Sequence, residues 1–127
     1  MNKIRFSHVW DKLNDPVFTT IRSWNKEKEE YYKEHTGEEF QIWKAKEVYP
    51  FRLEYVICHA FLRDVLLKNP RDISQAVLRK DVMLDGQIRE DWMKRILKYE
   101  KVLLLIFSKN EPSQSKMEDM EVMGALK

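Results

Sequence analysis

Apolar and polar residues alternate in short runs through the first half of the chain, and turn signals separate the runs. β-branched and aromatic residues predict strands over 3–9 and 17–23, with an Asn-Asp-Pro turn before the second. A third strand is predicted over 39–46, where Phe40 and Ile42 share one face. The first half of the chain is therefore expected to form much of a sheet.

Alternation resumes at Phe51, and apolar residues continue as far as Leu67. This run is too long for one straight strand, so we expect a bend, a bulge or a second short element within it. One helix is predicted before this run and one after it. Residues 25–35 are rich in Lys, Glu and Tyr and predict a short exposed helix, whereas an Asn-Pro start signal predicts a helix over 71–80.

The clearest amphipathic helix comes late in the chain. Ile88, Trp92, Ile96 and Tyr99 recur every three or four residues, so they line one side of a helix that buries them. The continuous apolar run 102–107 then predicts a buried strand inside residues 101–108. Strands first and helices late indicate an α+β fold with a curved or barrel-like sheet.

The domain is expected over residues 3–109. After Lys109 the composition changes to that of a linker, and the short Met-containing segment beyond it is too short for a stable isolated helix. We therefore interpret 110–127 as a flexible tail that is able to dock on a protein partner. The tail holds two lysines and four acids, so it carries −2 of a total net charge of +2. The remaining body carries +4, which permits a nucleic-acid partner without requiring one.

Composition excludes several classes of site. With 43% hydrophobic residues the 127-residue chain supports one core, and its single cysteine, Cys58, rules out an internal disulfide. The sequence contains no Gly-rich phosphate loop, no zinc-protease helix motif and no acidic calcium loop. We expect neither a metal nor a cofactor. The longest apolar run is too short to span a membrane and no signal-peptide core follows Met1, so we expect a cytoplasmic protein with no membrane partner.

Thr20 and Arg22 are the first candidates for chemistry. On a strand they project from the same face, while Ile21 points to the other face and can anchor the strand. A guanidinium binds phosphate or carboxylate through two parallel hydrogen bonds. Either the pair forms part of a binding site, or it marks the solvent face of an edge strand.

The same stretch resembles a known family. The Thr-Ile-Arg strand within 18–22, the Thr-Gly-Glu turn at 36–38 and the strand 39–46 resemble the N-terminal half of ASCH domains, small relatives of the PUA fold. The late helix with Trp92 and the closing strand 101–108 suit the same layout. The motif is short, and the rest of the similarity is agreement of pattern.

The resemblance covers roughly residues 3–109 and implies a pseudo-barrel of about five to six strands with flanking helices. It also implies a cleft that binds RNA or a nucleotide-like ligand, with a role in RNA metabolism or translation-related regulation. The positions of this chain that match the cleft-lining strand are Thr20 and Arg22.

Some bacterial ASCH proteins are amidohydrolases that deacetylate N-acetylcytidine, using a lysine three residues before the motif threonine and a downstream acid. Here the residue three before Thr20 is Val17, which can neither transfer a proton nor attack a carbonyl. Catalysis of this kind would need Thr20 with a lysine from elsewhere, for which Lys12 is the candidate. Glu90 and Asp91 are the candidate acids.

A basic and aromatic surface is expected around Arg22. Trp24 follows it by two residues and is predicted to stack on a base, while Lys44, Lys46 and Arg52 flank a connection and extend the positive surface. The leading interpretation is an RNA-binding module that uses these residues together with Thr20. The alternatives are the small amidohydrolase and a protein-interaction module that docks through residues 110–127.

Overall fold

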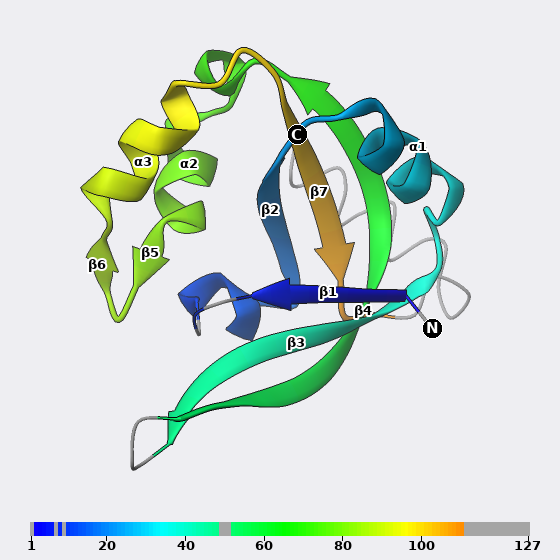
Figure 1. Cartoon of the computed structure of the whole chain (residues 1–127), viewed down its shortest axis with the longest axis vertical. Helices are drawn as coiled ribbons and strands as arrows, with labels where there is room; N and C mark the ends of the chain where they lie inside the picture. Colours follow the sequence, from blue (N-terminus) through cyan, green and yellow to red (C-terminus); the bar gives the residue numbers. More distant parts are fainter. Residues whose placement is uncertain (1, 7, 9, 49–51, 111–127) are drawn as a thin grey trace.

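The computed structural model describes residues 2–6, 8, 10–48 and 52–110, and Figure 1 shows how they are arranged. The expected tail lies outside these residues from 111 onward. In chain order the elements are β1 (Asn2–Phe6), the 3-10 turn η1 (Asp11–Asn14), β2 (Val17–Ser23), α1 (Lys26–Glu34), β3 (Glu39–Val48), β4 (Arg52–Lys68), the 3-10 turn η2 (Pro70–Asp72), α2 (Gln75–Asp81), β5 (Met83–Leu84), β6 (Gln87–Ile88), α3 (Glu90–Leu97) and β7 (Val102–Ser108).

Five strands form one mixed sheet in the order β1-β3-β4-β7-β2, and β5 and β6 form a separate hairpin. β1 pairs with β3 in parallel, and the other pairings of the large sheet are antiparallel. The predicted α+β class is confirmed. The sheet curves but stays open, because β1 and β2 are its edges and no ladder joins them within the described residues (Figure 1).

The long apolar run that begins near Phe51 forms the single strand β4. It is one strand of 17 residues that pairs with β3 along its first part and with β7 along its second. The register shifts between Leu62 and Asp64, and this irregularity is one of the three alternatives (a bend, a bulge or a second short element) that the length of the run predicted. The strand curves along the whole sheet (Figure 1), so it joins the two halves of the fold.

β7 is buried on both faces, as its continuous apolar run predicted. Leu103, Leu105 and Phe107 belong to the main core, whereas Val102 belongs to a second cluster. That second cluster also contains Ile73 and Leu78 and packs against apolar residues of α3. Helices α2 and α3 are thereby held against the end of the sheet where β2 and β7 meet.

Two predicted helix boundaries are wrong. α2 begins at Gln75 rather than 71, because the Ser74 side chain accepts a hydrogen bond from the Val77 N–H at 3.3 Å and caps it there. The Asn-Pro signal instead starts the short turn η2. Ile88, predicted within the late helix, lies in β6, and α3 begins two residues later.

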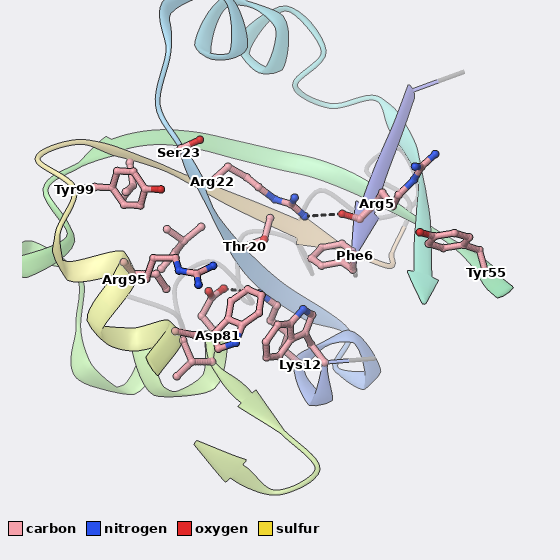
Figure 2. A pocket seen from close by; sticks show the side chains of 16 residues that line it. Arg5, Phe6, Lys12, Thr20, Arg22, Ser23, Tyr55, Asp81, Arg95 and Tyr99 are labelled. Atoms are coloured by element: carbon pink, nitrogen blue, oxygen red, sulfur yellow. Dashed lines mark hydrogen bonds and ion pairs between the residues drawn. The ribbon is translucent and has the colours of Figure 1, made fainter. Parts of the chain in front are cut away.

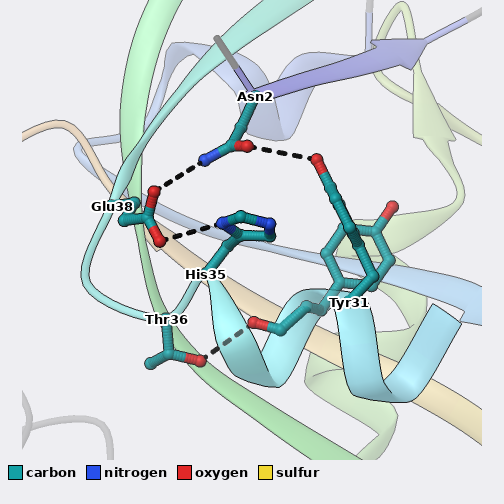
Figure 3. A network of polar contacts seen from close by, with 6 residues as sticks. Asn2, Tyr31, His35, Thr36 and Glu38 are labelled. Carbon is teal, nitrogen blue, oxygen red and sulfur yellow. Dashed lines mark hydrogen bonds and ion pairs between the residues drawn. The ribbon is translucent and has the colours of Figure 1, made fainter. Parts of the chain in front are cut away.

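α1 matches its prediction and is tied to β1 by a polar network at its C-terminal end (Figure 3). The His35 ring donates to the Glu38 carboxylate at 2.9 Å, and Asn2 donates to the other oxygen of that carboxylate at 3.2 Å. Tyr31 completes the network by donating to Asn2. The hydrogen bond from His35 holds the pKa of Glu38 below its ordinary value.

The β5–β6 hairpin places α2 and α3 relative to the N-terminal segment. Asp85 and Gly86 both have positive φ, 53° and 73°, as a tight two-residue turn requires. The Asp11 carboxylate accepts hydrogen bonds from both turn N–H groups, at 3.1 and 2.9 Å. This contact between η1 and the hairpin fixes one side of the site described next. None of the described helices is long and apolar enough to cross a membrane.

Candidate functional site

An open cavity of about 410 Å³, hereafter the central cavity, lies between the two edge strands and helices α2 and α3 (Figure 2). Its wall is formed by β1, η1, β2, the end of α2, α3 and one residue each of β4 and β7. The charged and hydroxyl-bearing residues in the wall include Arg5, Lys12, Thr20, Arg22, Asp81 and Arg95. The aromatic residues are Phe6, Trp10, Tyr55, Trp92 and Tyr99.

Thr20 and Arg22 both line this cavity, and they lie on one face of β2 as their spacing on a strand predicted. They pair with Leu105 and Leu103 of β7, so the two side chains leave the same face of β2. Ile21 packs against the second cluster from the opposite face. The two-residue period of the strand therefore sends the hydroxyl and the guanidinium into one hollow.

Arg22 reaches from one edge of the sheet to the other. Its Nη2 donates to the backbone carbonyl of Arg5 at 3.1 Å, and its guanidinium carbon lies 4.7 Å from the centre of the Phe6 ring. Its buried Nε has no hydrogen-bond partner among the described residues. Burial lowers the pKa of Arg22, against the opposing effects of Tyr32 and Asp81, but arginine stays protonated at neutral pH. The guanidinium is thus a partly buried cation whose Nε donor is left unmatched.

Lys12 and Asp81 form an ion pair deeper in the wall. The Lys12 ammonium contacts the Asp81 carboxylate, and the two residues are 3% and 8% exposed. Burial lowers the pKa of Lys12, and this effect exceeds the opposing attraction of Asp81; the nearby charge of Arg22 lowers it further. Lys12 and Thr20 both line the cavity, so an amine with a lowered pKa and a hydroxyl belong to the same wall.

The aromatic side of the cavity is built from two tryptophans. The rings of Trp10 and Trp92 meet edge to face with centres 5.3 Å apart, and the His8 ring packs against both. The guanidinium carbon of Arg95 lies 5.3 Å from the Trp92 ring centre. Trp92 was predicted to be a core residue, and the structure places it at the boundary between the main core and the cavity.

The cavity wall is positively charged. It contains four cations, Arg5, Lys12, Arg22 and Arg95, and one carboxylate, Asp81. Because Asp81 is already paired with Lys12, three arginines remain to attract an anionic ligand. Figure 2 shows Arg95 at one end of the cavity and Arg5 with Tyr55 at the other.

Several predicted site residues lie outside the cavity wall. Trp24 is 38% exposed and turns away, with its indole N–H donating to Glu29 at 3.2 Å and Lys101 above its ring. Lys44 and Lys46 lie on β3 and do not line the cavity. Arg52 begins β4, but its side chain lies outside the described residues. Trp24 was predicted to stack on a base beside Arg22, but β2 ends at Ser23, the alternation stops there, and Trp24 does not line the cavity.

The acid in the site also differs from the one predicted. Glu90 is the first residue of α3, is exposed and does not line the cavity. Asp91 does not line the cavity either, and its Oδ1 lies 3.6 Å from the Nε of Arg89. The carboxylate that lines the cavity is that of Asp81, which is paired with Lys12. A signal for it exists in the sequence, because an acid in the last turn of a helix opposes the helix dipole and needs another reason to be there.

No group of three or more His, Cys, Asp or Glu side chains with the geometry to hold a metal ion occurs among the described residues. Comparisons with models of protein families, with curated proteins and with solved structures find no match to this chain.

Proposed function

We propose that the central cavity binds a nucleotide-like ligand, and that the protein is an RNA-binding module of the ASCH type. The ligand of the central cavity places an anionic group against Arg22 and Arg95. Its flat, unstacked base lies among the aromatic side chains of the cavity wall. The observation that carries this proposal is the position of Arg22, a partly buried cation with an unmatched Nε donor in the wall of a positively charged, aromatic cavity. A volume of about 410 Å³ suits one nucleotide rather than a duplex.

The form of the sheet is consistent with this family proposal. The Arg22 side chain joins the two edge strands by its hydrogen bond to the Arg5 carbonyl, so the edges face each other although no ladder connects them. A curved sheet whose edges approach in this way is what a PUA-like pseudo-barrel of five strands requires. The function is correspondingly proposed in RNA metabolism or translation-related regulation.

Arg22→Gln is expected to weaken the binding of nucleoside monophosphates by about 10- to 100-fold, because hydrogen bonds to a charged group are worth about 1.5–3 kcal/mol. Arg95→Gln is expected to weaken it by about 3- to 10-fold, since Arg95 is exposed and more strongly screened. Isothermal titration calorimetry with CMP, UMP, AMP and GMP measures both effects.

Lys94→Gln is the matched control for that experiment. Lys94 is an exposed cation next to Arg95 on the same helix but does not line the cavity, so its replacement should leave binding unchanged. Binding to the unaltered protein should also weaken as salt is raised. Affinity that is independent of salt and of both arginines would remove the proposal.

Hydrolysis of an acylated nucleoside is the second candidate function, and the Lys12–Asp81 pair in the cavity wall favours it. Lys12 supplies from η1 the lysine that is missing at Val17, and its lowered pKa enlarges the neutral fraction that accepts a proton. The Thr20 oxygen would attack the amide carbonyl while its proton passes to the Lys12 amine. The C–N bond then breaks, Lys12 returns the proton to the leaving nitrogen, and water hydrolyses the threonine ester.

Incubation with N-acetylcytidine tests this second function, with cytidine and acetate measured by chromatography. If the reaction occurs, Thr20→Val and Lys12→Met should each reduce turnover by at least about 100-fold, the usual contribution of a positioned nucleophile or base. Glu90→Gln is the control and should leave turnover unchanged, because Glu90 does not line the cavity. No cytidine from N-acetylcytidine, and no product from other acylated nucleosides, would exclude the reaction.

A further inference from the structure

A row of aromatic and cationic side chains continues from the central cavity onto the outer face of the sheet. We call Lys3, Arg5, Trp43 and Tyr55 the outer strip. In β1, Ile4 and Phe6 point into the core, which turns Lys3 and Arg5 outward.

Strand pairing places the two aromatic residues on the same face. Arg5 lies opposite Trp43 across the β1–β3 pairing. Across the β3–β4 pairing, Trp43 lies opposite Ile57, and Ala45 lies opposite Tyr55. Residues directly opposite each other in neighbouring strands share a face of the sheet, and so do residues two apart in one strand, so all four members of the outer strip project from one surface.

Each aromatic ring in the outer strip has a cation against it. Lys3 Nζ lies 4.7 Å from the Trp43 ring centre, and the Arg5 guanidinium carbon lies 5.3 Å from the Tyr55 ring centre. The two rings are neighbours, with centres 5.7 Å apart. Gln41 accepts a hydrogen bond from the Trp43 indole N–H at 3.0 Å and holds the ring in place. No ion pair joins Lys3 or Arg5 to a carboxylate among the described residues, so both charges are available to an anion.

The outer strip is continuous with the cavity. Arg5 and Tyr55 belong to both, and Figure 2 shows them side by side at one end of the cavity, beyond Phe6. The backbone carbonyl of Arg5 also holds the Arg22 guanidinium at 3.1 Å. A ligand bound at Arg22 would therefore leave the cavity across Arg5 and reach Tyr55 and then Trp43.

We infer that the outer strip is a second subsite of the same binding site, and that the ligand is a single-stranded nucleic acid of at least two nucleotides. One base enters the central cavity, Arg5 contacts the phosphate that follows it, and the next base stacks against Tyr55 and Trp43. This inference rests on the proposed function and specifies its ligand class.

Alternating stacking surfaces and cations fit a single strand better than they fit other partners. Every base has a flat face that stacks on an aromatic ring, and every linkage carries one negative charge for a neighbouring cation. Lys3 and Arg5 are exposed and have long flexible side chains, so they can move from the ring faces to the phosphates when a base arrives. A duplex would not place separate bases against the two rings, because its bases stay stacked on each other.

Fluorescence anisotropy with a labelled eight-nucleotide single-stranded RNA, compared with calorimetry on a mononucleotide, tests this inference. Trp43→Leu is expected to weaken RNA binding by about tenfold, the loss of one stacked base, and to leave mononucleotide binding unchanged. Trp24→Leu is the matched control, because Trp24 is also an exposed tryptophan with a lysine over its ring but lies outside the cavity and the strip. It should change neither affinity.

Lys3→Gln provides a second measurement that does not depend on replacing a large side chain. It should weaken RNA binding and lower the slope of log affinity against log salt by about one, the loss of about one phosphate contact. RNA that binds no more tightly than a mononucleotide, or with an affinity insensitive to Trp43 and Lys3, would overturn the inference. The proposed function would still stand in that case, because it fails only if mononucleotide binding is independent of salt and of both Arg22 and Arg95.

Discussion

Asp81→Ala is expected to lower the free energy of unfolding by about 3–5 kcal/mol, one of the two largest effects that we predict for a single substitution in this chain. The Lys12 ammonium is 3% exposed, and Asp81 is its ion-pair partner. Removing the carboxylate leaves a charged group in a poorly solvated place, where the cost exceeds that of losing an ordinary hydrogen bond. Urea denaturation followed by circular dichroism measures the change.

The loss of unfolding free energy in Asp81→Ala is expected to depend on pH, in a direction set by the pKa of Lys12. The folded-state pKa of Lys12 lies below its ordinary value because burial outweighs the attraction of Asp81. Between those two values the unfolded chain binds more protons than the folded one, so the contribution of Lys12 to stability rises with pH. Loss of Asp81 lowers the folded-state pKa of Lys12 further. The difference in unfolding free energy between Asp81→Ala and the unaltered protein should therefore shrink as pH rises toward about 10.

The double variant Lys12→Met with Asp81→Leu is the control for the buried charge. It removes both members of the pair, so most of the stability lost in Asp81→Ala should return. A deficit in Asp81→Ala that is small, or that does not change with pH, would mean that Lys12 is not held as a buried cation.

Phe107→Ala is expected to destabilise the protein by about 3–5 kcal/mol through the cavity that it leaves in the core. Phe107 is fully buried, with its ring centre 5.4 Å from that of Phe18 and 5.5 Å from that of Phe40. The three rings join β2, β3 and β7, so their loss weakens the centre of the sheet. The midpoint and slope of urea denaturation provide the measurement.

Ile106→Ala is the matched control for Phe107→Ala. Ile106 is the preceding residue of β7, points to the opposite face and is only half-buried, so its truncation should cost about 1 kcal/mol. Equal effects of the two variants would contradict the assignment of Phe107 to the core face.

Local patterns account for most strand assignments. β2 has the predicted bounds, since its β-branched residues and the preceding proline turn act over neighbouring residues only. The continuous apolar run of β7 correctly predicted burial on both faces. The start of α2 was mispredicted because two capping signals lie close together, and the Ser74 hydroxyl rather than Asn69 caps the helix.

Placement of Thr20 and Arg22 in one wall was predictable because it needs only the two-residue period of a strand. Extending that period to Trp24 failed, since the strand ends one residue earlier. The prediction of Glu90 and Asp91 as the acids of the site missed Asp81 for another reason. Lys12 and Asp81 are 69 residues apart, and no local pattern relates two side chains at that separation.

The amino-acid sequence alone determined which segments form the strands of the large sheet, which face of β3 is apolar and which side chains leave β2 together, because these depend on steric preferences and periodicities within a few residues. Only the tertiary structure decided that the curved sheet brings its two edges to a common cavity, that Lys12 meets Asp81 there and that Arg5 and Tyr55 connect the cavity to Trp43. Those juxtapositions arise from sheet curvature and from helices packing on a shared core, which are properties of the whole chain.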